Sequence, residues 1–391
     1  MDALSYDPRS ALVIAGIPQT NRSLMHAIRF EVGDPAALVQ VPSNTGRRRI
    51  LIVRDIEMER ATKHAKADIV RCPADYAPPE GLSGDRETAT AQAVAGCLVQ
   101  SGVKQAVGHR SLPLIYADHI RSAGIELICE PDMGVRERRM KDEIEITALR
   151  RAQHITEEAM LLACRLVANA DVDRDGTLMV GDEVLTSERV RTEIDTFLLR
   201  RGFDSGGPIV AGGLDGSDCH AHGSGPLRTG EPVIIDIFPR DRQTGYHGDC
   251  TRTVVHGEVP ELVRDMHAAV VSAKKKATAA VRAGVTGEAV HAATVAEIEA
   301  AGFAVGLPGP NAPATRVAIT HGTGHGIGLE VHEPPLLDRA GPPLLVGDAL
   351  TIEPGLYGPS VGGIRVEDMV VVTEDGCISL NSLPEGLDWR E

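Results

Sequence analysis

The chain has 391 residues, enough for two domains, and 42% of them are hydrophobic, so we expect a buried core rather than disorder. The net charge of −15 argues against nucleic acid and anionic membranes as partners, since both favour basic patches. The seven cysteines form no CxxC pair, the N-terminus lacks a signal pattern and no apolar run is long enough to span a membrane, so a cytoplasmic protein is expected.

Residues 1–135 alternate short apolar strand patterns with amphipathic helix patterns. This alternation predicts an α/β domain. Pro131 and Gly134 then interrupt the pattern, so we place a boundary after residue 135 and a second domain over 136–391. The first domain is expected to contain strands at 11–17, 48–54, 105–109 and 125–130, and helices at 22–32, 87–102 and 114–124.

The second domain opens with a long amphipathic helix over 143–167, and another helix is expected over 187–202. Between them lies an acidic stretch whose spacing matches the start of a calcium loop, although its twelfth position carries Asp where Glu is usual. Two readings stay open: a structural calcium site remote from the chemistry, or an acidic surface turn. The candidate calcium ligands are Asp171, Asp173, Asp175 and Asp182.

Two aspartates follow in strand-like surroundings. A strand at 208–213 leads into a loop, and Asp236 then ends the apolar run VIID, while Asp249 precedes CTRTVV. Two helices, over 260–284 and 288–302, come next, and the lysine run 274–276 in the first reads as a solvated face.

The stretch 321–335, HGTGHGIGLEVHEPP, holds His321, His325 and His332 among four glycines. Glycine is unfavourable inside helices and suits sharp bends or close backbone approach. Histidine can ligate metal, shuttle protons or donate to a developing anion. A solvated loop with idle histidines is the alternative interpretation.

Two further acids follow the histidines. Glu353 ends an expected strand at 349–353, and Glu367 lies in another at 363–373. Acids are rarely buried unless they are paired or bind metal. Four acids around a histidine cluster therefore predict a site for two divalent cations that activate water, because oxygen ligands with one imidazole suit Mn, Co, Zn or Fe.

The motifs DCTRT, GHGIGLEVHEP, TIEPGLY and GIRVED, in this order, resemble the M24-type metallopeptidases, which include methionine aminopeptidase, aminopeptidase P and prolidase. The resemblance implies a C-terminal pita-bread catalytic domain behind an N-terminal α/β domain of the creatinase and prolidase type. It also implies that Asp249 and Glu367 bridge the two ions. The implied metal ligands are Asp236, Asp249, His325, Glu353 and Glu367.

The chemistry of these residue types suggests a hypothetical mechanism, and the resemblance adds a substrate-contacting histidine ahead of the first aspartate. Glu353 would carry the proton from water to the leaving amine, and His332 would donate hydrogen bonds to substrate. In the loop 214–225, His220 is the expected second donor, with His222 as the alternative. His321 would hold the substrate or a free terminus. Arg365 would orient a carboxylate or stabilise Asp249, with an ordinary salt bridge as the other reading.

The two-domain length favours the proline-specific branch, so we expect cleavage of Xaa-Pro bonds in a peptide or dipeptide substrate. Aminopeptidase P and prolidase remain undecided. Manganese is the first expectation for the metal, and a homodimer is expected. A lyase or other non-peptidase on the same scaffold and a catalytically silent binding protein are the alternatives. One departure from the family pattern is Ile237-Phe238, where a small residue and glycine are usual.

Overall fold

The computed structural model describes residues 7–390. The chain divides into two compact units, one ending at Arg138 and the other beginning at Arg139. The sequence places its boundary slightly earlier, after residue 135. No helix within residues 7–390 combines the length and the apolar character needed to cross a bilayer.

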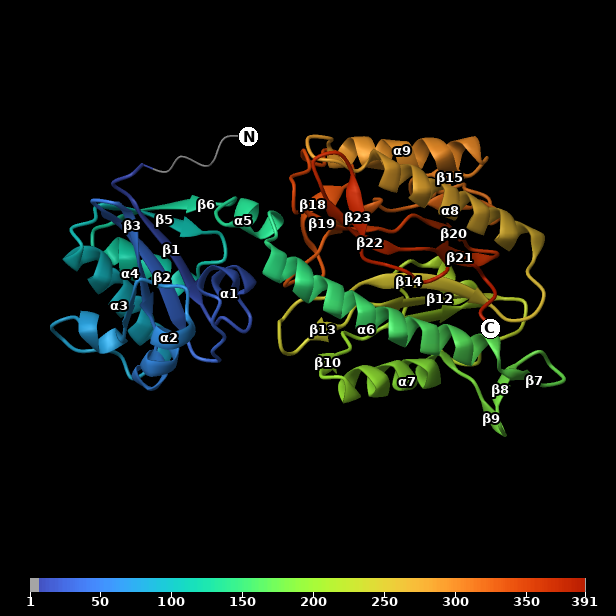
Figure 1. Cartoon of the computed structure of the whole chain (residues 1–391), viewed down its shortest axis with the longest axis horizontal. Coiled ribbons are helices and arrows are strands. Elements are labelled where there is room, and N and C mark those ends of the chain that lie inside the picture. The colour runs from blue at the N-terminus through green and yellow to red at the C-terminus, as the bar shows by residue number, and fades with distance from the viewer. Residues whose placement is uncertain (1–6, 391) are drawn as a thin grey trace. The chain divides into compact units, whose positions relative to one another are not determined.

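The first unit is built on one six-stranded sheet with the order β4-β3-β2-β1-β5-β6 (Figure 1). The ladders β1–β2 and β2–β3 are antiparallel and the other three are parallel. The strands are β1 Ala11–Gly16, β2 Ala36–Ser43, β3 Gly46–Ile52, β4 Ile69–Arg71, β5 Gln105–His109 and β6 Glu126–Glu130. The helices are α1 Arg22–Ile28, α2 Met58–His64, α3 Arg86–Gln100, α4 Leu114–Ser122 and α5 Val135–Arg139.

Helices cover both faces of this sheet. Val13 and the other β1 side chains on the same face of the sheet pack with Val94 of α3 and Ile120 of α4. On the opposite face, Leu12 packs with Leu24 of α1. Alternate residues of β1 therefore serve two cores. The α/β prediction for this part of the chain is confirmed, although the sequence patterns did not reveal β2, β4 or α2.

The second unit consists of curved sheets with helices on their outer sides. Its three larger sheets have the orders β11-β12-β14, β15-β16-β20-β21 and β18-β17-β19-β22-β23. The helices are α6 Glu143–Ala168, α7 Ser187–Arg200, α8 Glu261–Ala280 and α9 Gly287–Ala300. The strands of those sheets are β11 Ile209–Gly212, β12 Pro232–Ile237, β14 Cys250–Val255, β15 Ala304–Val305, β16 Ala318–Ile319, β17 Gly324–Gly326, β18 Glu333–Leu337, β19 Ala349–Ile352, β20 Gly355–Gly358, β21 Gly362–Arg365, β22 Asp368–Val372 and β23 Cys377–Ser379.

Two pairs of helices enclose these strands (Figure 1). Helix α6 packs against β12 and β14, and α7 packs against α6 and β11, around a core that includes Met160, Leu198 and Ile235. Helix α8 packs against β20 and β21 through Met266 and Leu356. The strands thus form the inside of the unit, where polar side chains can gather between the sheets.

The candidate calcium segment folds as a small three-stranded sheet of β7 Asp171–Val172, β8 Leu178–Val180 and β9 Glu183–Val184. The Asp173 carboxylate closes its first turn by accepting from the amides of Asp175 at 2.9 Å and Thr177 at 2.8 Å. Two groups of metal-ligand side chains occur within residues 7–390, and neither includes the four aspartates of this segment.

Two other expectations differ from the structure. The strand expected at 363–373 is two strands, β21 and β22, broken around Glu367. Lys274, expected on a solvated face, is 4% exposed and forms ion pairs with Asp368 and Glu385. A buried lysine needs such partners, and they lie too far along the sequence to be seen in a local pattern.

Candidate metal centre

Asp236 and Asp249 face the same side of the β12–β14 ladder. Asp236 pairs directly with Thr251. Because side chains alternate along a strand, Asp249 shares the face of Thr251 and hence of Asp236. The long hairpin between the two strands therefore preserves the register that brings the two carboxylates together.

Helix α6 fixes the backbone of Asp249 through a buried glutamine. The Gln153 side chain accepts from the Asp249 amide at 2.8 Å and donates to the Asp249 carbonyl at 2.7 Å. The preceding residue is Gly248, where a Cβ would lie 2.2 Å from the Thr156 hydroxyl and 2.8 Å from the Ala152 carbonyl oxygen. Only glycine lets the strand approach the helix closely enough for both bonds.

Glu353 and Glu367 come together in the same way at the end of another ladder. Strands β19 and β22 are antiparallel, and Ile352 pairs with Asp368. Glu353 and Glu367 are the next residues outward, so they lie opposite each other. The Thr251 hydroxyl donates to Glu367 Oε2 at 2.7 Å, which ties this pair of acids to the β12–β14 sheet.

His325 on β17 presents one ring nitrogen to these acids. Its Nδ1 lies 3.1 Å from the Gly326 carbonyl oxygen, so Nδ1 carries the proton and Nε2 has a free lone pair. That Nε2 lies 3.4 Å from Glu353 Oε1 and 4.0 Å from Asp249 Oδ2. Ligand atoms of Asp249, His325 and Glu367 all lie within 4.8 Å of one another, and the three residues are buried.

Arg365 places a positively charged guanidinium group in the lining of the cavity that these acids share. Its Nη2 donates to Asp236 Oδ2 at 2.7 Å, and its Nη1 donates to the Tyr357 hydroxyl at 3.0 Å. The other oxygen of the same carboxylate, Asp236 Oδ1, is buried and has no hydrogen-bond partner within the described residues. A buried carboxylate oxygen without a partner is costly, so this atom marks a place for a ligand.

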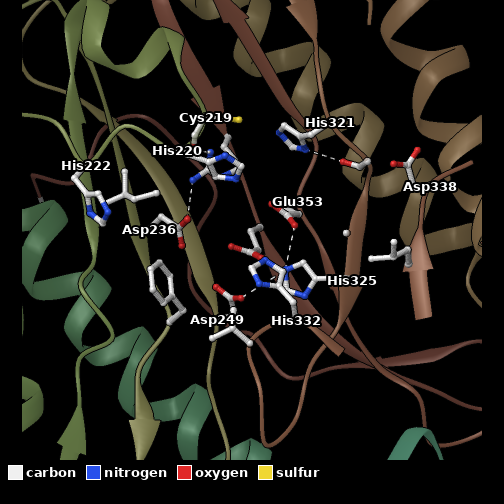
Figure 2. Close-up of a pocket in the computed structure, with 18 residues that line it drawn as sticks. Cys219, His220, His222, Asp236, Asp249, His321, His325, His332, Asp338 and Glu353 are labelled. Atoms are coloured by element: carbon white, nitrogen blue, oxygen red, sulfur yellow. Dashed lines mark hydrogen bonds and ion pairs between the residues drawn. The ribbon is translucent and has the colours of Figure 1, made fainter. Parts of the chain in front are cut away.

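The other histidines lie around this group (Figure 2). The His332 ring is 4.4 Å from the His325 ring, centroid to centroid. His321 is engaged at both nitrogens, because Nδ1 donates to the Gly322 carbonyl at 2.7 Å and Nε2 accepts from the Tyr357 hydroxyl at 2.8 Å. A substrate contact by His321 would therefore have to replace one of these bonds.

All of these side chains line one cavity of about 540 Å³. Figure 2 shows labelled acids and histidines around this cavity, on strands and on the segments between them. His220 and His222 both line it, so the structure brings together every residue proposed for the chemistry and keeps both candidates for the second histidine. Apolar walls are provided by Ile209, Phe238, Val331 and Leu336.

Burial and the charges of neighbouring acids shift the pKa values of the carboxyl groups in this cavity. Burial, followed by repulsion from Glu367 and Asp236, raises the pKa of Asp249 well above its ordinary value. Burial also raises the pKa of Glu353 and of Glu367, with repulsion from neighbouring acids adding to it. Burial lowers the pKa of His325, which favours the neutral, metal-binding form of its ring.

These residues fit a pair of divalent cations. Four carboxylates supply negative charge that two such ions would offset, since Arg365 offsets it only at Asp236. The Asp236 oxygen without a partner and His325 Nε2 belong to residues that line the cavity. Oxygen donors with one imidazole suit Mn²⁺, Co²⁺, Zn²⁺ or Fe²⁺. The arrangement is that of a metal-dependent hydrolase site.

Solved structures of two dipeptidases have the same fold as this chain. The fold matches that of the Xaa-Pro dipeptidase from Bacillus anthracis with a TM-score of 0.76, at 22% identity over 97% of this chain and 94% of that one. The dipeptidase PepE from Mycobacterium ulcerans matches with a TM-score of 0.74, at 27% identity over 97% and 92% of the two chains. The N-terminal α/β domain and the C-terminal pita-bread domain are thus confirmed.

The chain belongs to the metallopeptidase family M24, whose model matches residues 147–374. It is 32% identical over 280 residues to a probable dipeptidase, PepE, of Mycobacterium tuberculosis, covering 71% of this chain and 68% of that protein. It is 27% identical over 279 residues to an Xaa-Pro dipeptidase of Pyrococcus horikoshii, covering 70% and 72%. Membership of this family implies divalent metal ions.

Sequence reading missed the residues that support the site. Gln153 interrupts the apolar face of α6, and a buried amide on such a face is a signal for a specific partner. The hydroxyl of Tyr357 connects His321 to Arg365, a link that no local sequence pattern indicates.

Proposed function

We propose that this metallopeptidase is a dinuclear exopeptidase that cleaves Xaa-Pro bonds. The observation that carries the proposal is the convergence of four buried or half-buried carboxylates and one imidazole on a single cavity. The names of its relatives, PepE dipeptidase and Xaa-Pro dipeptidase, favour a dipeptide as substrate. Aminopeptidase P activity on longer peptides is the neighbouring possibility, supported by the fold of an X-Pro aminopeptidase from Thermotoga maritima.

The proposed ligands are Asp236, Asp249, His325, Glu353 and Glu367, with Asp249 and Glu367 in bridging positions. Bound there, two divalent cations would lower the pKa of a water molecule and polarise the scissile carbonyl. Manganese is our first choice. We do not extend the metal proposal to Asp171–Asp182, because the Asp173 carboxylate already serves the turn of a hairpin.

Glu353 is the proposed proton carrier. Its carboxylate lies in the cavity beside His325 Nε2, where it can accept a proton from the attacking water and return it to the leaving amine. Burial raises the pKa of Glu353, which makes its carboxyl group a better proton acceptor than an exposed glutamate.

His332 and His220 are the proposed donors to the substrate. His332 borders the ligand group beside His325, and His220 lies on the loop at another wall of the cavity (Figure 2). Donors in these places would stabilise negative charge as it develops on the substrate oxygen. His321 and Arg365 both hydrogen-bond to the Tyr357 hydroxyl and so stabilise this side of the cavity. Arg365 also orients the Asp236 carboxylate.

The test is an assay of metal-stripped protein restored with Mn²⁺, Co²⁺ or Zn²⁺. We expect hydrolysis of Xaa-Pro dipeptides and much slower hydrolysis of matched Xaa-Ala dipeptides. Cleavage of longer Xaa-Pro peptides as well would assign aminopeptidase P activity. If fully metal-loaded protein cleaves none of these substrates, the peptidase proposal is wrong.

A further inference from the structure

A second group of metal-binding atoms lies on the wall of the catalytic cavity. Ligand atoms of Asp218, Cys219 and His220 lie within 4.8 Å of one another. Cys219 and His220 line the same cavity as the proposed dinuclear site, as Figure 2 shows. This group offers one sulfur, one nitrogen and one oxygen donor, whereas none of the five proposed catalytic ligands is a cysteine.

The backbone of this loop is held in place by bonds that leave the thiol and the imidazole unused. Asp218 Oδ1 accepts from the His220 amide at 2.9 Å, and the Asp218 carbonyl accepts from the Ala221 amide at 3.2 Å. The Cys219 carbonyl accepts from Arg365 Nη1 at 3.2 Å. Arg365 thereby anchors the loop to the floor of the catalytic site.

The geometry and chemistry of these donors suit a thiophilic cation. Zinc bonds of about 2.0–2.3 Å in a tetrahedral site place neighbouring ligand atoms roughly 3.3–3.8 Å apart. The 4.8 Å limit on the separation of these donor atoms exceeds those distances by roughly 1–1.5 Å. Side-chain rotation can close that gap, because Asp218 and His220 are exposed. Thiolate and imidazole favour zinc or cadmium over the harder manganese ion.

We propose that Asp218, Cys219 and His220 form a third metal site, which takes a zinc-class cation and inhibits the enzyme when it is filled. Binding forms a bond from the metal to the cysteine sulfur and releases the thiol proton to solvent. It also occupies the imidazole of His220. The inhibitory part rests on the proposed function, in which His220 contacts substrate, whereas the binding part does not.

Binding is tested on protein loaded with manganese and freed of excess metal, with Cd²⁺ as the added probe. We expect a thiolate-to-cadmium absorption band that saturates at one equivalent and is absent in Cys219→Ser. Cys72→Ser removes a half-buried cysteine of the other unit and is the matched control, so it should keep the band. A band that persists in Cys219→Ser, or no band in the unsubstituted protein, would overturn the site.

Inhibition is tested by adding Zn²⁺ at constant manganese, with each variant referred to its own rate without zinc. Cys219→Ser lacks one ligand of the proposed site, so half-inhibition of this variant should require a zinc concentration at least about tenfold higher. Even the loss of a residue that only hydrogen-bonds to a metal ligand costs roughly 10–100-fold in metal affinity. Equal inhibition of Cys219→Ser and Cys72→Ser would mean that zinc acts elsewhere. If no substrate is cleaved at all, the proposed function fails, and the cadmium band still decides the site.

Discussion

Three carboxyl groups of the cavity hold protons more tightly than an exposed carboxyl group does. Burial and mutual repulsion raise the pKa of Asp249, Glu353 and Glu367 above the ordinary range near 4. A divalent cation removes the repulsion and must displace any proton still bound. Metal binding and proton release are therefore linked at these residues.

The first prediction follows from the sign of this linkage. As pH falls toward the raised pKa values, protons compete with the metal, so metal affinity should decrease as pH decreases. The decrease should reach about tenfold per pH unit for each proton displaced. Calorimetric titration with Mn²⁺ in buffers of different ionisation heat should show net proton release. An affinity that stays constant from mildly acid to mildly alkaline pH would contradict the raised pKa values.

A second prediction concerns Asp249 alone. Replacing it with alanine in Asp249→Ala removes a proposed bridging ligand, so both metal content and turnover should be lost. Asp338→Asn is the matched control, because Asp338 lines the same cavity but is not a proposed ligand. Metal content is measured by elemental analysis after gel filtration. Normal metal content or normal turnover in Asp249→Ala would refute the bridging role.

At the scale of elements, a buried ion pair fixes the loop that carries His332. Lys141 Nζ lies 3.0 Å from Glu333 Oε2, and both side chains are 2% exposed. Glu333 Oε1 also accepts from the amides of Leu329 at 2.8 Å and Glu330 at 3.1 Å, which closes the turn leading to β18. Lys141, two residues before the start of α6, thus supports the loop of His332 almost two hundred residues further along the chain.

The third prediction tests this support. Lys141→Met leaves the buried Glu333 carboxylate without its cation and should destabilise the unit by about 3 kcal/mol. The thermal midpoint of metal-loaded protein should fall by roughly 5–10 °C. Adding Glu333→Gln to this variant should restore part of the loss, since the unpaired charge is then gone. An unchanged midpoint in Lys141→Met would show that the pair contributes nothing.

At the scale of the whole molecule, sequence patterns predicted two domains and most strands of four or more residues, and the family resemblance added the cavity residues. Asp236, Glu353 and Glu367 stand at strand ends, where an acid beside an apolar run is conspicuous. The patterns did not reveal Gln153 or the burial of Lys274, because their partners lie 96 and 94 residues away. Local periodicity reports which face is apolar, not which buried polar group will find a partner.

The hairpin at Asp171 is a segment for which the sequence left two interpretations open, a calcium loop and an acidic surface turn. Its aspartates have the spacing of a calcium loop, yet their short strands pair with one another and Asp173 caps a turn. Asp and Gly are favoured in both structures, so composition alone cannot distinguish them.

The fourth prediction uses the division into two units. The five proposed ligands and their supports Gln153, Thr251 and Arg365 all lie in the second unit. A fragment of residues 136–391 should therefore fold and bind two metal ions. Circular dichroism and metal analysis of the purified fragment check this, with the same fragment carrying Asp249→Ala as the control. A folded fragment without metal would contradict the assignment of the site to this unit.

The most direct test of the account is anomalous diffraction from crystals grown with Mn²⁺, measured at the manganese absorption edge. The account predicts two neighbouring peaks enclosed by the carboxylates of Asp236, Asp249, Glu353 and Glu367, with His325 Nε2 on one of them. A single peak, or manganese bound only outside this group, would contradict it.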